Sequence, residues 1–331
     1  MKPPRCPTHP RSVPPLFRTL VSCSLLAAFI SEAEPKPLSN PEPSPEAKNV
    51  YRFIAGVYGK AILAGQQEST WVNRNPDDEM DYIKKNTGKL PAIRGLDYMA
   101  YNGVTERTIA WWKLGGIPSI CWHWGAPTLG IGYEASKRSI DVKEALTPGT
   151  ALNKAMMADL DRTAAELAKL RDAHVPVLWR PFHELNGGWF WWGKGGPESF
   201  KSLWKLMYQH YTQTHKLNNL IWVLGYTGKP DARWYPGDAY VDIAGADTYS
   251  QGTQHRMFES LLSIVGTNMP VCYHECGPIP DPDAMIADGT KWTWFLTWHT
   301  IHIKRQNSIE YINKVYNHPY VVTLDKLPNL K

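Results

Sequence analysis

Residues 153–184 read NKAMMADLDRTAAELAKLRDAHVPVLWRPFHE, and this stretch contains a complete helix-to-strand unit. Residues 153–173 have an apolar stripe with the period of a helix, which predicts an amphipathic helix. The stripe consists of Met156, Leu160, Ala164 and Leu167. Residues 176–182 then form a short apolar run that predicts a strand, and the polar pair His183-Glu184 follows it. This order is typical of proteins in which helices alternate with the strands of a parallel sheet.

The same alternation recurs through residues 50–320. The predicted strands are 62–66, 90–95, 117–122, 176–182, 220–224, 242–247, 269–274 and 293–298. The predicted helices are 77–86, 106–114, 153–173, 198–215, 257–265 and 308–317, whereas 225–241 has the composition of a loop. Eight strands that alternate with helices predict one α/β domain, a closed (β/α)8 TIM barrel with its active site at the C-terminal strand ends. No GxGxxG motif follows the first strand, so a dinucleotide site is not predicted.

The N-terminal region differs in composition from the rest of the chain. Of the 27 prolines, 11 lie within residues 1–45, too many for regular helices or strands. Basic residues precede an apolar run at 20–30, and Ser31-Glu32-Ala33 follows it, which predicts a secretory signal peptide over 1–33. Residues 34–48 are rich in Pro and Glu and are expected to form a linker before a catalytic domain at 49–331.

Export is therefore expected, to an extracellular or periplasmic location. Leu20-Val21-Ser22-Cys23 also resembles a lipoprotein cleavage site. Most of the apolar run follows Cys23, however, so we favour secretion over lipid anchoring.

Charge and cysteine content exclude several classes of partner. Four of the 36 basic residues and one of the 31 acidic residues lie in 1–33, so the remainder has a formal net charge of only +2. We therefore expect no nucleic-acid partner, and no membrane partner beyond the leader. Outside the leader only Cys121, Cys272 and Cys276 remain, which cannot form a disulfide framework and contain no CxxC pair. No cofactor is expected, and we expect a monomer.

Aromatic residues point to a carbohydrate ligand. All 15 tryptophans lie after residue 70, and the densest group, Trp189-Phe190-Trp191-Trp192, follows the turn Asn186-Gly187-Gly188. Some tryptophans belong to the core, but these four side chains cannot all face inward on a regular element. We therefore interpret this group as an exposed surface on which sugar rings stack.

Polar residues gather at the predicted strand ends, where a barrel of this kind has its active site. They are Gln66, Gln67, Glu68, Arg94, Asp97, His123, His183, Glu184, Asp247, Tyr249, His274, Glu275, Trp298 and His299. The dipeptide His-Glu ends both the fourth and the seventh strand. Two carboxylates at the mouth of one barrel are what glycosidic cleavage requires, since one protonates the leaving oxygen and the other attacks the anomeric carbon. Purely structural roles for Glu184 and Glu275 are the alternative.

Arg180 is expected to support this pair. Residues two apart in a strand share a face, so Arg180, Phe182 and Glu184 are predicted to point the same way. Arg180 could then hold a carboxylate inside the barrel, with Glu275 as the candidate, or form a structural ion pair deeper in the barrel.

Zinc chemistry is a second possibility. His123, His183 and His274 could converge on a metal ion. However, His183-Glu184-Leu185-Asn186-Gly187 lacks the second histidine of HExxH, so no metal is predicted, and sugar binding is the favoured role for each histidine.

The segment 180–193, RPFHELNGGWFWWG, resembles the acid/base segment of glycoside hydrolase family 26, whose main members are endo-β-1,4-mannanases. Further matches follow in the family's order at Trp122-His123-Trp124, Asp247-Thr248-Tyr249, His274-Glu275-Cys276-Gly277 and Phe295-Leu296-Thr297-Trp298. The resemblance covers residues 50–320.

The resemblance implies a role for individual residues. Glu184 would be the acid/base, with His183 beside it, and Glu275 the nucleophile, hydrogen-bonded by Tyr249. His123 and Trp189 would line the sugar sites, and Trp298 would form the stacking floor at the point of cleavage. The expected function is retaining endo-β-1,4-mannanase activity. Alternatives are a β-1,3-1,4-glucanase or β-1,3-xylanase on the same scaffold, a zinc-dependent hydrolase, or a non-catalytic carbohydrate-binding barrel.

Overall fold

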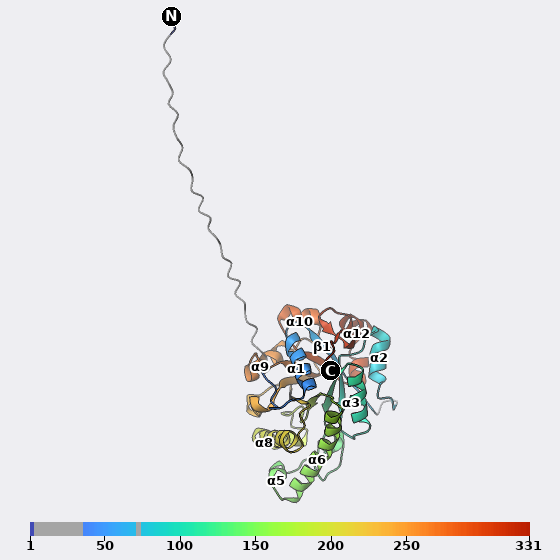
Figure 1. The fold of residues 1–331 in the computed structure, drawn as a ribbon, viewed down its shortest axis with the longest axis vertical. Helices are drawn as coiled ribbons and strands as arrows, with labels where there is room; N and C mark the ends of the chain where they lie inside the picture. The colour runs from blue at the N-terminus through green and yellow to red at the C-terminus, as the bar shows by residue number, and fades with distance from the viewer. Residues whose placement is uncertain (3–35, 71–73) are drawn as a thin grey trace. The chain divides into compact units, whose positions relative to one another are not determined.

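Alternating strands and helices dominate the computed structural model, which describes residues 1–2, 36–70 and 74–331. The strands are β1 Ile62–Gln67, β2 Ile93–Asp97, β3 Ile117–Cys121, β4 Val177–Arg180, β5 Leu220–Thr227, β6 Ile243–Thr248, β7 Val271–Cys276, β8 Trp294–Thr297 and β9 Val321–Val322. The longer helices are α1 Pro45–Val57, α2 Asp78–Thr87, α3 Val104–Lys113, α6 Ala151–Asp172, α8 Gly196–Gln209, α9 His255–Val265, α10 Pro282–Asp288 and α12 Ile309–Tyr316. Figure 1 shows α2, α3, α6, α8, α9, α10 and α12 arranged around the strands.

Short helical segments occur in the loops between these elements. They are α4 Tyr133–Ser136, α5 Val142–Leu146, α7 Trp191–Lys194, α11 Ile301–Lys304, a π-helix η1 His210–Thr214, and the 3-10 helices η2 Ala232–Trp234, η3 Asp238–Tyr240 and η4 Leu324–Lys326. Only η2 and η3 lie between β5 and β6, as expected for residues 225–241.

The sheet closes on itself. Strands β1 to β8 pair in parallel in chain order, and β1 pairs with both β8 and β2. The short β9 pairs with the start of β1. The prediction of a (β/α)8 barrel is therefore confirmed, with all eight strands at the expected places.

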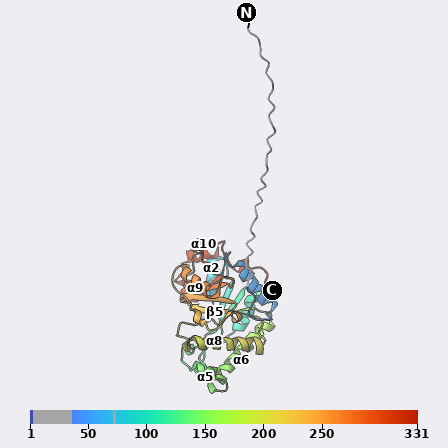
Figure 2. The same cartoon turned by 90° about the vertical axis from the view of Figure 1, so that its left-hand side faces the viewer.

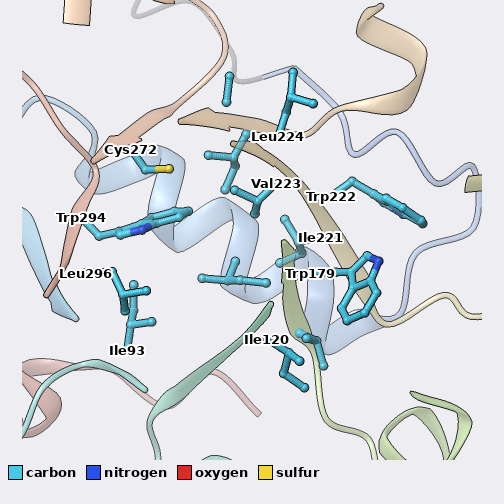
Figure 3. Close-up of a cluster of buried hydrophobic side chains, with 14 of the residues drawn as sticks. Ile93, Ile120, Trp179, Ile221, Trp222, Val223, Leu224, Cys272, Trp294 and Leu296 are labelled. Carbon is cyan, nitrogen blue, oxygen red and sulfur yellow. The ribbon is translucent and has the colours of Figure 1, made fainter. Parts of the chain in front are cut away.

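The strands are buried on both faces because helices cover the outside of the barrel. Every residue of β1, β3, β4 and β7 is buried. Figure 3 shows side chains from different strands gathered in this core, among them Trp179 of β4, Trp222 of β5 and Trp294 of β8. This continuous core holds the C-terminal strand ends at fixed positions.

Residues before β1 also belong to the folded unit, although 34–48 was expected to be a linker. The backbone amide of Ser39 donates to Asp242 at 2.5 Å, and Asn40 donates to the carbonyl of Leu217 at 3.1 Å. Ser44 caps α1, whose apolar face is buried. The proline-rich segment can pack because its backbone bonds to side chains and loop carbonyls rather than to a sheet. The predicted signal peptide, residues 1–33, lies outside the described residues except for its first two.

Beyond Arg180 the chain departs from the expected strand. Phe182 and Glu184 have φ of 52° and 51°, in the left-handed region, so side chains no longer alternate as in a strand. Phe182 packs outward against Trp124 and Trp204 at ring distances of 5.9 and 6.3 Å. The prediction that Arg180, Phe182 and Glu184 share one face is therefore wrong.

Within the described residues, none of the helices has the combination of length and apolarity needed to cross a membrane.

Candidate active site

Two glutamates from different strand ends meet at the mouth of the barrel. Glu184 follows β4, and Glu275 lies near the end of β7. One carboxylate oxygen from each of Glu184, Asp247 and Glu275 lies within 4.8 Å of the other two. Glu184 and Glu275 face a cavity of about 550 Å³, within the usual range for small-molecule sites. The cavity is lined by Asp97, Met99, His123, Tyr133, His183, Glu184, Phe190, Tyr249, Glu275, Trp298, His299 and His302.

Two neighbouring groups stabilise the ionised form of Glu275. The Tyr249 hydroxyl donates to Glu275 Oε2 at 3.3 Å, and Arg180 Nη2 lies 3.5 Å from Oε1. Arg180 is fully buried and also donates from Nη1 to the carbonyl of His274 at 2.8 Å. Burial raises the pKa of Glu275 to about 7, and Arg180 opposes that rise. The predicted contact between Arg180 and Glu275 is thus present.

Among the described residues, Trp189 is the donor to the Glu184 carboxylate. Trp189 Nε1 donates to Glu184 Oε2 at 2.6 Å. Burial raises the pKa of Glu184, while this hydrogen bond and the nearby His123 oppose the rise. No guanidinium is within ion-pair distance of Glu184 among the described residues, so Glu184 lacks the cationic partner that Arg180 provides for Glu275. Two carboxylates with unlike surroundings are a common basis for separate acid and nucleophile roles.

Asp247, at the end of β6, is a third carboxylate in this group. It is buried, and none of the described residues hydrogen-bonds to its Oδ2, although His274 Nδ1 lies 3.6 Å away. Burial raises the pKa of Asp247 well above its usual value, and Glu184 and Glu275 raise it further. Folding therefore favours the neutral form of Asp247. Its position at a strand end was predicted, but its closeness to the two glutamates depends on the fold and could not be.

A hydrogen-bonded chain of histidines forms another wall of the cavity. His123 Nδ1 lies 2.5 Å from Asp97 Oδ2, and His123 Nε2 lies 3.1 Å from His183 Nε2. Burial opposes protonation of His123, but Asp97 outweighs it and leaves the pKa raised. Burial and the neighbouring His123 hold the pKa of His183 well below its usual value. The neutral His183 and the Asp97-supported His123 are thus fixed in orientation beside Glu184.

The tryptophans predicted to bind sugar differ in how far they are exposed. Trp298 lines the cavity as expected, and Trp189 has 42% of its surface exposed. Trp191 and Trp192 are completely buried, so the prediction that the whole group is an exposed stacking surface is wrong. Trp191 donates to the carbonyl of Trp124 and Trp192 to that of His183. Both side chains stabilise the loop after β4, because each buried indole N–H donates a hydrogen bond to a backbone carbonyl.

Several cavity residues were not predicted. Tyr133, on α4, contacts the ring of His123 edge-on at 5.3 Å, and the ring of His302, on α11, lies 4.7 Å from that of Tyr249. Both residues come from loop helices rather than strand ends, so the strand-end rule could not find them.

The zinc hypothesis finds little support in this geometry. His274 is buried with its ring nitrogens 3.4 and 3.5 Å from the Arg180 guanidinium. A cation at this position would be repelled by Arg180. Within the described residues, His123, His183 and His274 do not form one group of close ligand atoms, and His123 groups with Asp97 and Cys121 instead.

Comparison with known proteins agrees with the fold. The family model for glycosyl hydrolase family 26 matches residues 39–326. A mannan endo-1,4-beta-mannosidase of Thermothelomyces thermophilus is 38% identical over 315 residues, which cover 88% of this chain and 63% of that protein. The structure of a GH26-CBM35 β-(1,4)-mannanase of Podospora anserina matches with a TM-score of 0.82 and 34% identity, covering 89% of this chain and 69% of that one.

A third match covers most of both chains. The β-mannanase of a symbiotic protist of the termite Reticulitermes speratus, solved with a gluco-manno-oligosaccharide, has a TM-score of 0.80 and 33% identity, with coverage of 88% and 98%. By contrast, the chain spans only 50% to 63% of three curated relatives. The fold and the site define a glycoside hydrolase barrel, and the chain belongs to glycosyl hydrolase family 26.

Proposed function

We propose that this protein is a retaining endo-β-1,4-mannanase with Glu184 as its acid/base and Glu275 as its nucleophile. The observation that carries the proposal is the approach of the two carboxylates to within 4.8 Å inside the cavity. Retaining glycosidases need a separation of about 5–5.5 Å, whereas inverting enzymes need a wider gap to admit water.

The unlike surroundings of the two glutamates support the assignment. Arg180 and Tyr249 stabilise negative charge on Glu275, which suits attack on the anomeric carbon. Glu184 then donates its proton to the leaving glycosidic oxygen. In the second step Glu184 takes a proton from water, and that water displaces Glu275 from the sugar. The hydrogen bond from Trp189 stabilises Glu184 in the ionised form that exists between the two steps.

Mannan is the proposed substrate because the matched relatives are named as mannanases. We expect the release of mannobiose and mannotriose from unbranched β-1,4-mannan, with lichenan and β-1,3-xylan as the comparison substrates. Cleavage of lichenan with mannan untouched would contradict the substrate and leave the two-glutamate mechanism standing.

Azide rescue tests the two roles. An activated aryl β-mannoside needs little help from an acid, so Glu184→Ala should form the glycosyl-enzyme and then stall. Azide needs no base and should restore turnover with a β-glycosyl azide as product. Glu275→Ala should be nearly inactive on every substrate, and azide should yield only the α-product. Proton NMR of the products gives the configuration, and a β-azide from Glu275→Ala would contradict the assignment.

We also propose that the chain is exported and acts as a monomer on polysaccharide outside the cytoplasm. Secretion of the full-length protein in an expression host, with N-terminal sequencing of the mature form, tests the export signal. Retention of the uncleaved chain in the cytoplasm would contradict it.

A further inference from the structure

A group of three potential metal ligands lies on the outside of the barrel, away from the catalytic cavity. Asp161 belongs to α6, and His210 and His215 lie at the end of α8, in and directly after the π-helix η1. Figures 1 and 2 both show α6 and α8 side by side. None of the three residues lines the cavity around Glu184 and Glu275.

The three ligand atoms converge closely. Asp161 Oδ1 lies 2.6 Å from His210 Nε2 and 2.9 Å from His215 Nε2, and the two Nε2 atoms are 3.2 Å apart. Side-chain exposure is 56% for Asp161, 16% for His210 and 28% for His215. The imidazoles are thus held by their surroundings, while the carboxylate is open to solvent on the outer side.

The π-helix brings the histidines together. In an α-helix, residues five apart point about 140° away from each other. Here the amide of His215 donates to the carbonyl of His210 at 3.1 Å, an i to i+5 bond that places the two side chains on one face. The local backbone therefore produces a pairing that a regular α8 would prevent.

The separation of the two imidazole nitrogens suits a zinc ion, whereas the Asp161 oxygen, at 2.6 and 2.9 Å from them, lies closer than a tetrahedral site requires and would move outward on binding. Tetrahedral coordination with Zn–N distances of about 2.0–2.1 Å separates two ligand nitrogens by about 3.3 Å, and the observed Nε2 separation is 3.2 Å. An ion about 2.05 Å from all three atoms would lie about 1.2 Å above their plane. Two imidazoles and one carboxylate are ligands that zinc and similar divalent transition metals accept. Water could complete the coordination on the exposed side.

We propose that Asp161, His210 and His215 form a surface site for one zinc-type divalent ion that joins α6 to the end of α8. The site is independent of glycoside cleavage, and its effect is on stability. An ion that binds only the folded chain shifts the folding equilibrium toward the native state. The histidines must be neutral at Nε2 to bind, so the ion replaces the protons that otherwise hold the three groups together.

Zinc titration of the untagged, chelator-treated full-length protein tests the proposal. Calorimetry should detect one site per chain in the wild type, and its affinity should fall by about tenfold or more in Asp161→Asn and in His215→Ala. Asp161→Asn changes one exposed group, so it keeps the test valid if His215→Ala fails to fold. Zinc should also raise the melting temperature of the wild type but not that of either variant.

His318→Ala is the matched control. His318 Nε2 lies 3.0 Å from Asp283 Oδ1, so it forms a histidine–carboxylate pair without a second histidine. His318→Ala should bind zinc as the wild type does. Equal zinc affinity in the wild type, Asp161→Asn and His215→Ala would place the ion elsewhere, for instance at the three catalytic carboxylates, and would overturn the proposal. Absence of zinc binding to the wild type would also overturn it, leaving a proton-linked His-Asp cluster.

Discussion

Glu184 and Glu275 are of the same residue type, and their immediate neighbours make them differ. Trp189 donates to Glu184, whereas Tyr249 donates to Glu275 and Arg180 lies beside it. Each donor stabilises the ionised form of the glutamate that it contacts. Removing one donor should therefore raise the pKa of one glutamate, which allows the two roles to be separated by pH.

Tyr249→Phe tests the nucleophile. Loss of the hydroxyl raises the pKa of Glu275, which must be ionised to attack, so the acidic limb of the kcat/KM profile should move to higher pH. The basic limb should stay in place. The optimum kcat/KM should fall by about 2- to 10-fold, the usual effect of one hydrogen bond. The pH dependence of kcat/KM on soluble mannooligosaccharides is the measurement.

Trp189→Phe tests the acid/base in the opposite sense. The ring is kept, but the donor to Glu184 is lost, so the pKa of Glu184 rises. Since Glu184 must be protonated in the first step, the basic limb of kcat/KM should move to higher pH. Movement of the acidic limb in Trp189→Phe, together with the basic limb in Tyr249→Phe, would show that the roles are exchanged.

At the scale of elements, the turn between β4 and α7 places both the proposed acid/base, Glu184, and its donor, Trp189. Glu184 adopts φ of 51°, and Gly188 has φ of 79°. A β-carbon at Gly187 would lie 2.3 Å from the ring of Trp189, so only glycine permits this ring position. The two adjacent glycines are thus needed for different reasons, one for space and one for backbone conformation.

Substitutions at these glycines should have different effects. Gly187→Ala should displace Trp189 from Glu184 and lower kcat/KM by about 100-fold, since misplacement by about 1 Å can cost that much. At Gly188 no atom lies within 4 Å of an added β-carbon, so Gly188→Ala meets only the left-handed backbone penalty. That variant should lose about 1–2 kcal/mol of stability. Activity assays combined with urea unfolding would separate the two effects, and equal loss of activity in both variants would contradict this account.

At the scale of the whole molecule, the barrel brings three carboxylates together at a cost in stability. Each comes from a different strand end, and burial raises the pKa of all three. A carboxylate whose pKa is raised by folding stabilises the native state fully only below its unfolded pKa. The contribution is lost as the pH rises toward the folded pKa. The site is therefore a place where catalytic arrangement opposes stability.

Asp247→Asn should relieve part of this cost. Asn resembles the neutral carboxyl that the fold favours, and it does not ionise in the unfolded chain. The free energy of unfolding should therefore exceed that of the wild type at about pH 7, and the gain should shrink toward about pH 4, where unfolded Asp is protonated. Each unit of pKa difference corresponds to about 1.4 kcal/mol. Urea unfolding across this range is the measurement, and a gain that is independent of pH would contradict the raised pKa of Asp247.

Much of the fold could be predicted from local patterns. All eight barrel strands were found because a buried strand is a short apolar run whatever its neighbours are. Both His-Glu pairs were found because strand ends can be counted along the chain. Helix α1 was missed, since its start at Pro45 lies in a proline-rich segment that resembles a linker. The length of β4 was overestimated, because Phe182 and Glu184 adopt left-handed backbone angles that no local pattern indicated.

The sequence by itself determined the barrel, the order of its strands and the two glutamates at their ends, because hydrophobic periodicity is a property of neighbouring residues. Only the tertiary structure decided which groups share a site. It brought Arg180 to Glu275 and Asp247 to both glutamates, and it buried Trp191 and Trp192 while leaving Trp189 exposed. It also joined Asp161 to two histidines on another helix. Burial, pKa and contact depend on residues far apart in the chain, and these become neighbours only when the barrel closes.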